Sequence, residues 1–161
     1  MKQENKLVKA NKGFTLIELL VVIAIIGLLS SVILVAVYNA RAKSRDAKRV
    51  SDMTRMQLGL ELFNSANRGY PAATGSGLPD NLMPTYIAGF PTAPVPADGN
   101  CDTLTNPAGQ PANTYYYVPT GTTSVVNGFT VYPDYKYYFC VGQKTGDVTA
   151  GVRAITPKGV E

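Results

Sequence analysis

The chain has 161 residues, a formal net charge of +4 and no histidine. This length accommodates one small domain with an anchor rather than two full domains. Histidine is the most common general base and zinc ligand. Because it is absent, and because no nucleophile–base pair, phosphate loop or carboxylate pair is recognisable, we predict that the protein is not an enzyme and holds no cofactor.

The N-terminal part of the chain changes abruptly from basic to apolar. Residues 1–13 carry four lysines against one glutamate, whereas residues 14–38 contain a single charged residue, Glu18. A helix of this length spans a bilayer core of about 30 Å at about 1.5 Å per residue. The apolar run is too long for a cleaved secretory signal, and its small residues Ser30 and Ser31 lie inside it. We therefore predict a membrane-spanning helix.

The orientation of this helix does not follow from charge, because basic residues flank it on both sides. The two cysteines, Cys101 and Cys140, lie on its C-terminal side. A single disulfide fits an oxidising compartment, and two buried free thiols are the alternative. We expect a single-pass protein of the cell membrane, with residues 1–13 in the cytoplasm and the C-terminal region outside it.

Residues 12–18 read Lys-Gly-Phe-Thr-Leu-Ile-Glu and lead without a gap into an apolar helix that runs through Gly27. This order resembles the processing site of type IV prepilins and of the pseudopilins of type II secretion. The resemblance covers residues 12–40, is fainter as far as Pro71, and concerns only the layout of elements beyond that.

The resemblance implies that a prepilin peptidase cuts after Gly13 and methylates the new amino group of Phe14, while Lys12 holds the leader at the anionic cytoplasmic surface. It also implies that an inner-membrane assembly platform adds copies of the chain to a helical filament. Glu18 would then pair with the Phe14 amine of a neighbouring subunit, which offsets an insertion cost of about 2.5–3.5 kcal/mol. A Phe14–Glu18 pair within one helix is the other geometry.

One position departs from the pattern of many pilus-forming pilins. They have a proline about eight residues after the glycine that matches Gly27, and their helix partly melts between the two in the fibre. Here Val35 stands at that point, and no proline occurs between Phe14 and Tyr70. The sequence therefore provides no reason to expect a melted segment.

The helix is predicted to continue over residues 39–68 with two distinct faces, and to stop at the Asn67–Pro71 segment. Apolar residues at helical spacing should pack on the C-terminal domain: Met53, Met56, Leu60 and Phe63. A second face carries a charged stripe: Arg41, Arg45, Lys48, Asp52 and Arg55. We expect this stripe to meet lipid headgroups before assembly and neighbouring subunits afterwards. Nucleic acid is not expected, because no aromatic residues are interleaved for base stacking.

The C-terminal region is predicted to combine long loops with strands. Residues 71–112 are rich in Pro, Gly, Ala, Thr and Asn, and residues 86–96 are expected to lie across the helix. Strand patterns cover 114–119, 128–132, 135–141 and 152–156. Seven of the ten tyrosines fall between residues 115 and 138, where we expect packed rings with wet hydroxyls. A surface for stacking glycans is the alternative.

One pattern resembles a calcium loop. Asp98, Asn100 and Asp102 alternate as its ligands do, but the sixth position is Thr103 and the twelfth is Gly109. Major pseudopilins often bind calcium through acidic residues of the last loop, where this chain offers only Asp147. We therefore predict no metal site.

These observations predict an α+β fold of the pilin type. A long N-terminal helix, apolar in its first half and amphipathic in its second, packs on a small antiparallel β-sheet with long loops. The expected domains are a leader (1–13), a transmembrane and assembly helix (14–40), an amphipathic helix (41–68) and an extracytoplasmic β domain (69–161). The expected function is a structural subunit of a type IV pilus-like filament. The alternatives are a pseudopilin of a type II secretion system and a monomeric, membrane-anchored binding protein.

Overall fold

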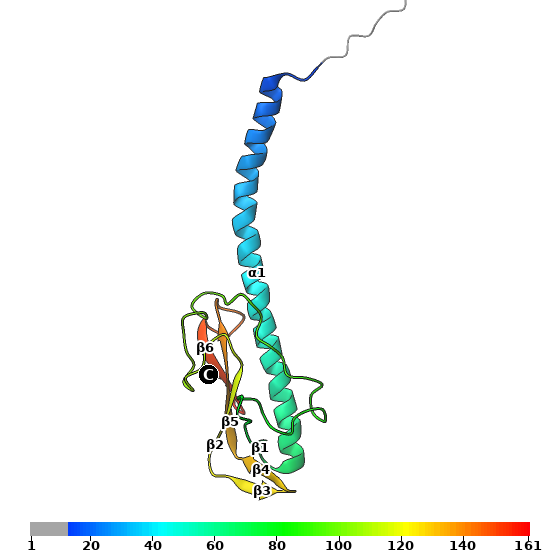
Figure 1. Ribbon diagram of the computed structural model, residues 1–161, viewed down its shortest axis with the longest axis vertical. Helices are drawn as coiled ribbons and strands as arrows, with labels where there is room; N and C mark the ends of the chain where they lie inside the picture. Colours follow the sequence, from blue (N-terminus) through cyan, green and yellow to red (C-terminus); the bar gives the residue numbers. More distant parts are fainter. Residues whose placement is uncertain (1–12) are drawn as a thin grey trace, which may run out of the picture. The chain divides into compact units, whose positions relative to one another are not determined.

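The structure is a computed structural model, and it describes residues 13–161. It has one helix, α1 (Leu16–Asn67), followed by seven strands (Figure 1). The strands are β1 (Tyr70–Pro71), β2 (Tyr116–Thr120), β3 (Ser124–Val126), β4 (Phe129–Tyr132), β5 (Asp134–Val141), β6 (Gly151–Thr156) and β7 (Gly159–Val160). The chain divides into two units, one ending at Asn39 and one comprising Ala40–Glu161. A long helix followed by antiparallel strands confirms the predicted α+β fold.

The strands form two antiparallel sheets rather than one. One has the order β1-β4-β3 and the other the order β2-β5-β6-β7. The chain passes from the first sheet to the second at Pro133, between β4 and β5. Because proline has no backbone N–H to donate to a ladder, a break between the sheets is natural at this point.

Four of the strands correspond to the predicted ones, with ends that differ by one or two residues: β2, β4, β5 and β6. The prediction missed β1, β3 and β7, which contain only two or three residues each. Segments this short have no readable alternation of polar and apolar residues. They are strands because a longer neighbour pairs with them, as Tyr70 pairs with Tyr132.

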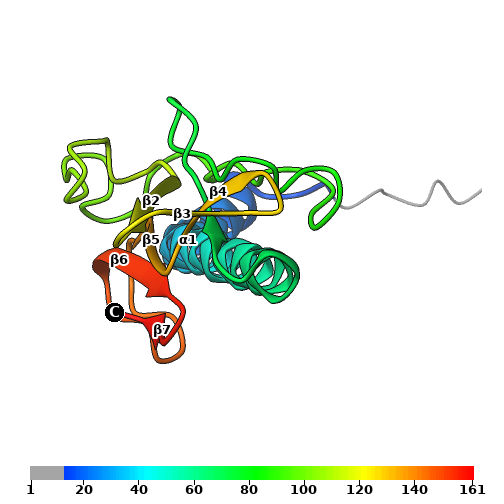
Figure 2. The same cartoon turned by 90° about the horizontal axis from the view of Figure 1, so that it is seen from below.

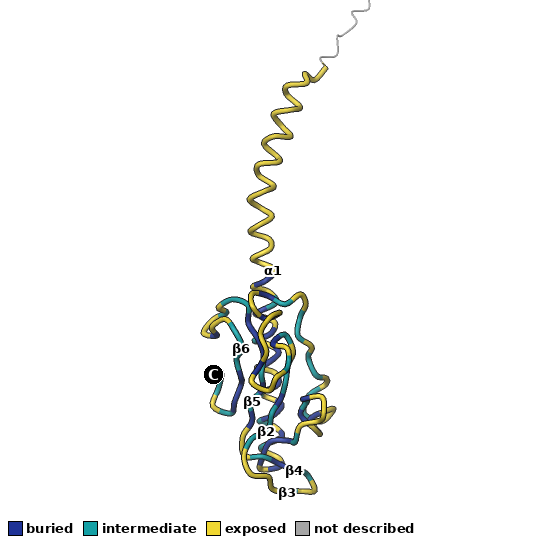
Figure 3. The backbone as a smooth tube through the Cα atoms, turned by 60° about the vertical axis from the view of Figure 1, so that its left-hand side comes forward, coloured by how far each residue is buried: buried dark blue, intermediate teal, exposed yellow. Residues whose placement is uncertain are grey.

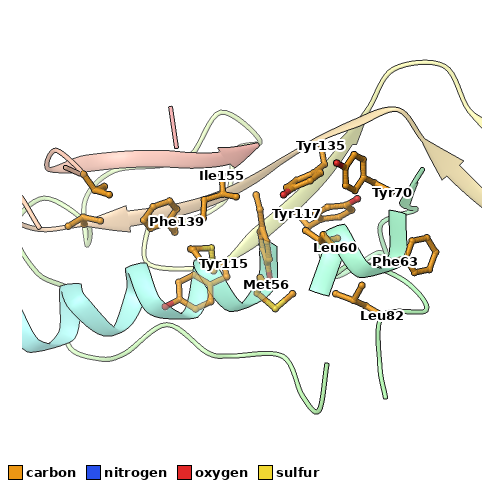
Figure 4. Close-up of a cluster of buried hydrophobic side chains, with 14 of the residues drawn as sticks. Met56, Leu60, Phe63, Tyr70, Leu82, Tyr115, Tyr117, Tyr135, Phe139 and Ile155 are labelled. Atoms are coloured by element: carbon orange, nitrogen blue, oxygen red, sulfur yellow. The ribbon is translucent and has the colours of Figure 1, made fainter. Parts of the chain in front are cut away.

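The core of the second unit lies between the C-terminal part of α1 and the sheets (Figures 2 and 4). As predicted, one face of α1 is buried there: Met53, Met56, Leu60 and Phe63. Aromatic rings fill much of the space opposite. The rings of Tyr70 and Tyr135 meet edge to face, with centroids 4.7 Å apart, and those of Phe63 and Tyr86 do so at 5.3 Å.

The tyrosines of the sheet are buried more deeply than predicted. Tyr117, Tyr135 and Tyr137 are at most 1% exposed, so the expectation of wet hydroxyls is wrong for these three. Strand alternation turns them all toward α1. The Tyr117 hydroxyl donates to the Pro71 carbonyl oxygen at 2.8 Å, and burial raises the pKa of all three phenols.

The loop after β1 crosses α1, as the sequence predicts for residues 86–96. Leu82 is fully buried, and Tyr86, Ile87 and Phe90 pack against the core. The contact depends on Gly59, because a β-carbon at this helical position would lie 2.4 Å from Cγ2 of Ile87. A helix glycine, otherwise unfavourable by about 1 kcal/mol, thus lets the loop approach the helix closely.

Candidate functional site

Helix α1 begins with a reciprocal cap between Thr15 and Glu18. The backbone N–H and the hydroxyl of Thr15 donate to Oε2 of Glu18, at 2.9 and 2.7 Å. The backbone N–H of Glu18 donates to Oγ1 of Thr15 at 3.3 Å. This is a capping box, which satisfies backbone donors that the first helical turn leaves without partners. Gly13 and Phe14 therefore precede the helix and are exposed.

Thr15 was not predicted as the partner of Glu18, although the Thr-x-x-Glu spacing is a recognisable signal of a capping box. The predicted partner, the Phe14 amine, does not exist while Gly13 is attached. Phe14 and Glu18 nevertheless share a face, since they line one hollow of about 360 Å³ together with Ile17, Val21 and Val22. Lys12, and the rest of the leader before it, lie outside the described residues.

The apolar first part of α1 makes no burying contact in the described part of the chain. Every residue from 14 to 41 is exposed (Figure 3), including Leu16 at 85% and Leu34 at 74%. By length and composition, α1 is long and apolar enough to cross a membrane. Such a surface needs lipid or other protein chains around it.

A cluster of buried charges stands where α1 enters the second unit. Arg49 is fully buried and bridges Asp46 at 2.7 Å and Asp98 at 2.8 Å. Arg45, with a side chain 19% exposed, holds Asp98 from the other side and donates from Nε at 2.8 Å. The cluster ties the loop around Asp98 to the helix.

The same cluster fixes the turn that follows β5. The carboxylate of Asp46 accepts the backbone N–H groups of Gly142 and Gln143, at 3.0 and 2.9 Å. Gly142 also lies against the Asp98 backbone, because a β-carbon there would be 2.5 Å from the Asp98 carbonyl carbon. Helix, loop and turn therefore meet at Asp46.

One expectation from the sequence changes at this cluster. The charged stripe is not available as a whole to headgroups or neighbouring subunits. Asp52 is buried and accepts a hydrogen bond from the Tyr115 hydroxyl at 3.1 Å, and Arg45 binds Asp98. Only Arg41, Lys48 and Arg55 of the stripe are exposed. The oxygens of Asp98, the first residue of the calcium-like pattern, face arginines instead of an open loop.

A disulfide joins Cys101 to Cys140, with a Cα–Cα distance of 5.8 Å. The sequence also predicts this pairing. It links the loop of residues 94–113 to β5 next to the charge cluster, so that covalent and ionic contacts hold the same loop.

Removing the disulfide by the double substitution Cys101→Ala and Cys140→Ala is expected to cost about 3–4 kcal/mol of unfolding free energy. In the chain-entropy model the loss arises because the unfolded chain is no longer closed between residues 39 apart. Urea unfolding of the purified full-length chain, followed by tyrosine fluorescence, measures it. An unchanged unfolding midpoint would contradict a stabilising role.

Acid is expected to weaken the charge cluster through Asp98. Hydrogen bonds from Arg45 lower the pKa of the Asp98 carboxyl. Burial raises this pKa, and hydrogen bonds from Arg49 lower it further. Because the pKa of Asp98 is lower in the folded chain, its ionised carboxylate stabilises the fold at pH values above the unfolded-state pKa of about 3.9. This contribution is lost as the pH falls through the folded-state pKa. The difference in unfolding midpoint between the natural chain and Asp98→Asn should thus be constant at neutral pH and shrink below about pH 4. A difference that does not vary with pH would contradict the assignment.

The comparisons with known proteins agree with these features. Residues 8–34 match the family model described as "Prokaryotic N-terminal methylation motif". Type II secretion system core protein G of Escherichia coli (strain K12) is 37% identical over 42% of this chain and 46% of its own length. The protein of the same name from Vibrio cholerae is 28% identical over 89% of this chain and 90% of its own.

A relative with a different name is the type IV major fimbrial protein FimA of Dichelobacter nodosus, which is 36% identical over 44% of this chain and 45% of its own length. The chain thus spans about half the length of the Escherichia and Dichelobacter relatives and most of the Vibrio one. No solved structure matches the chain significantly. The methylation motif at the start of α1, the relatives of both names and the observed fold together make the chain similar to type IV pilins and type II secretion pseudopilins.

Proposed function

We propose that the chain is the precursor of a structural subunit of a type IV pilus-like filament. Prepilin peptidase removes residues 1–13 by cleaving after Gly13, and the new amine of Phe14 is methylated. The mature subunit then stacks through residues 14–40 with copies of itself and related pilins. The observation that carries the proposal is the first part of α1, where every residue from 14 to 41 is exposed although most of them are apolar.

Cleavage would change the partner of Glu18. In the precursor its carboxylate accepts two hydrogen bonds from Thr15. The amine of Phe14 is a cation once it is released, so its hydrogen bond to the Glu18 carboxylate would join two opposite charges, whereas Thr15 offers neutral donors. In a low-dielectric bundle of helices, such a pair between subunits favours one axial register over others.

The location follows from the same segment. Before assembly, residues 14–40 span the inner membrane and their apolar surface is covered by lipid. The domain that contains the disulfide lies outside the cytoplasm, and an inner-membrane assembly platform transfers the subunit to the filament. In this proposal nucleic acid has no part.

A second candidate function is that of a pseudopilin. It is favoured by the Vibrio relative, a type II secretion core protein that aligns over 90% of its length. The loop between β5 and β6, with its single acidic residue Asp147, and the disulfide to β5 favour the pilus.

Mass spectrometry of filaments sheared from cells tests the proposal. We expect a chain that begins at methylated Phe14 and is abundant in the sheared fraction. The same processed chain found only in membranes would support the pseudopilin instead. An uncut chain that begins at Met1 would contradict both and leave a membrane-anchored binding protein.

A further inference from the structure

The guanidinium of Arg49 lies in a cage of oxygen atoms. Arg49 is among the largest fully buried side chains of the protein, and its two terminal nitrogens donate only to oxygen. The acceptors are Asp46 Oδ1 at 2.7 Å, Asp98 Oδ2 at 2.8 Å, Pro94 O at 2.9 Å, Asn113 Oδ1 at 3.0 Å and Pro96 O at 3.4 Å. They come from α1, from the loop before Cys101 and from the end of the segment that precedes β2.

These five oxygens are the kinds that bind hard divalent cations. Ca²⁺ takes about six to eight oxygen ligands from carboxylates, backbone carbonyls, side-chain amides and water, at about 2.3–2.6 Å and in flexible geometry. The cage supplies two carboxylates, two carbonyls and one amide oxygen. Its backbone carbonyls belong to prolines, and Asp46 is held in place by the N–H groups of Gly142 and Gln143.

The charge of the cage depends on Arg49. The carboxylates of Asp46 and Asp98 are balanced by Arg49 and Arg45. Without Arg49, Asp98 would keep its ion pair with Arg45, but the buried Asp46 carboxylate would lose its bridge to Arg49, and three neutral oxygens would point into the vacated space. Buried charge without a partner is strongly unfavourable, so a cation from solution would be drawn to this place.

We propose that Arg49 is a built-in cation: its guanidinium fills an oxygen site that would otherwise take a divalent ion such as Ca²⁺. It thereby fixes the loop of residues 94–113 and the turn at Gly142 on α1 without any ion from solution. The inference concerns the fold of the second unit and holds whether or not the chain polymerises. It predicts that substitution of Arg49 by a neutral residue converts a Ca²⁺-independent domain into a Ca²⁺-dependent one.

Thermal unfolding of the full-length chain in detergent micelles, followed by near-ultraviolet circular dichroism of the tyrosines, tests this. Each variant is measured in EDTA and in excess Ca²⁺. We expect the midpoint of the natural chain to be the same in both. Arg49→Ala should melt at a much lower temperature in EDTA, and Ca²⁺ should raise its midpoint by about 5 °C or more. Arg45→Ala is the matched control: it also removes a cation from Asp98 but leaves the cage filled, so Ca²⁺ should not restore it.

Several results would overturn the proposal. One is a natural chain stabilised by Ca²⁺, and another is an equal Ca²⁺ response of the Arg45→Ala and Arg49→Ala variants. Arg49→Gln, which retains more of the side-chain volume, covers the case in which the alanine variant does not fold in EDTA. Folding of Arg49→Ala or of Arg49→Gln only in the presence of Ca²⁺ supports the inference. The inference is contradicted if Arg49→Ala and Arg49→Gln both remain unfolded in excess Ca²⁺, or if Ca²⁺ leaves both unfolding midpoints unchanged.

Discussion

Replacement of Glu18 by alanine is expected to abolish filaments while membrane insertion of the chain stays intact. Insertion is unaffected or improved because the substitution removes the one charged residue from residues 14–38, and a carboxylate there costs about 2.5–3.5 kcal/mol. Assembly fails because no carboxylate remains to pair with the Phe14 amine of a neighbouring subunit. Cell fractionation measures insertion, and electron microscopy of sheared material measures filaments.

Two matched variants separate assembly from helix capping. Thr15→Val removes the hydroxyl that donates to the Glu18 carboxylate and accepts from the Glu18 backbone N–H. The Glu18 carboxylate itself remains, so filaments should persist. Ser31→Ala removes a different polar group from the same apolar segment, a hydroxyl that donates to the Leu28 carbonyl oxygen at 2.8 Å. This variant should also assemble. Normal filaments from Glu18→Ala would contradict the pairing hypothesis. Loss of filaments in Thr15→Val would mean that the loss in Glu18→Ala comes from the broken helix cap.

Replacement of Asp46 by alanine is expected to lower the unfolding free energy of the domain by about 3–5 kcal/mol, the range for breaking a buried ion pair from one side. The side chain is fully buried, bridges Arg49 and accepts two backbone N–H groups. Its removal leaves a buried cation with one carboxylate fewer and frees the turn at Gly142. Since small domains are stable by only about 5–15 kcal/mol, this is a large fraction of the total.

Urea unfolding of the full-length chain in detergent measures this loss, with Asp102→Ala as control. Asp102 is an exposed aspartate, and surface substitutions of this kind change stability by about 0.5 kcal/mol or less. Similar losses for the two variants would mean that the charge cluster contributes little to stability.

The sequence predicts well what is encoded locally. The apolar run starting at Phe14 and the buried face from Met53 to Phe63 follow from composition and helical spacing. The longer strands follow from runs rich in tyrosine, phenylalanine and valine. Each of these signals lies within one stretch of chain, so no knowledge of distant contacts is required.

The charge cluster could not be predicted in the same way. Arg45 and Asp98 are separated by 53 residues, and nothing in the helical pattern distinguishes an arginine that binds a loop from one that faces solvent. Helical spacing alone placed Arg45 and Asp52 on a stripe expected to meet lipid headgroups and neighbouring subunits, whereas tertiary contacts bury Asp52 beside Tyr115. The capping box is a different case, since Thr15 and Glu18 are close in sequence and their spacing was overlooked.

The first part of α1 has an unusual symmetry. From Leu19 to Leu29 every residue is apolar or glycine. This stretch makes about three full turns, so the helix is apolar around its whole circumference. A one-sided apolar stripe is covered by partners on that side only, and association stops at a small closed bundle. A circumference without a preferred side can be covered by several neighbours at once, and each newly added copy presents the same uncovered surface to the next. In the proposed filament this segment can therefore contact several neighbouring subunits at once, and Glu18 is the charged residue that distinguishes one height along the helix from another.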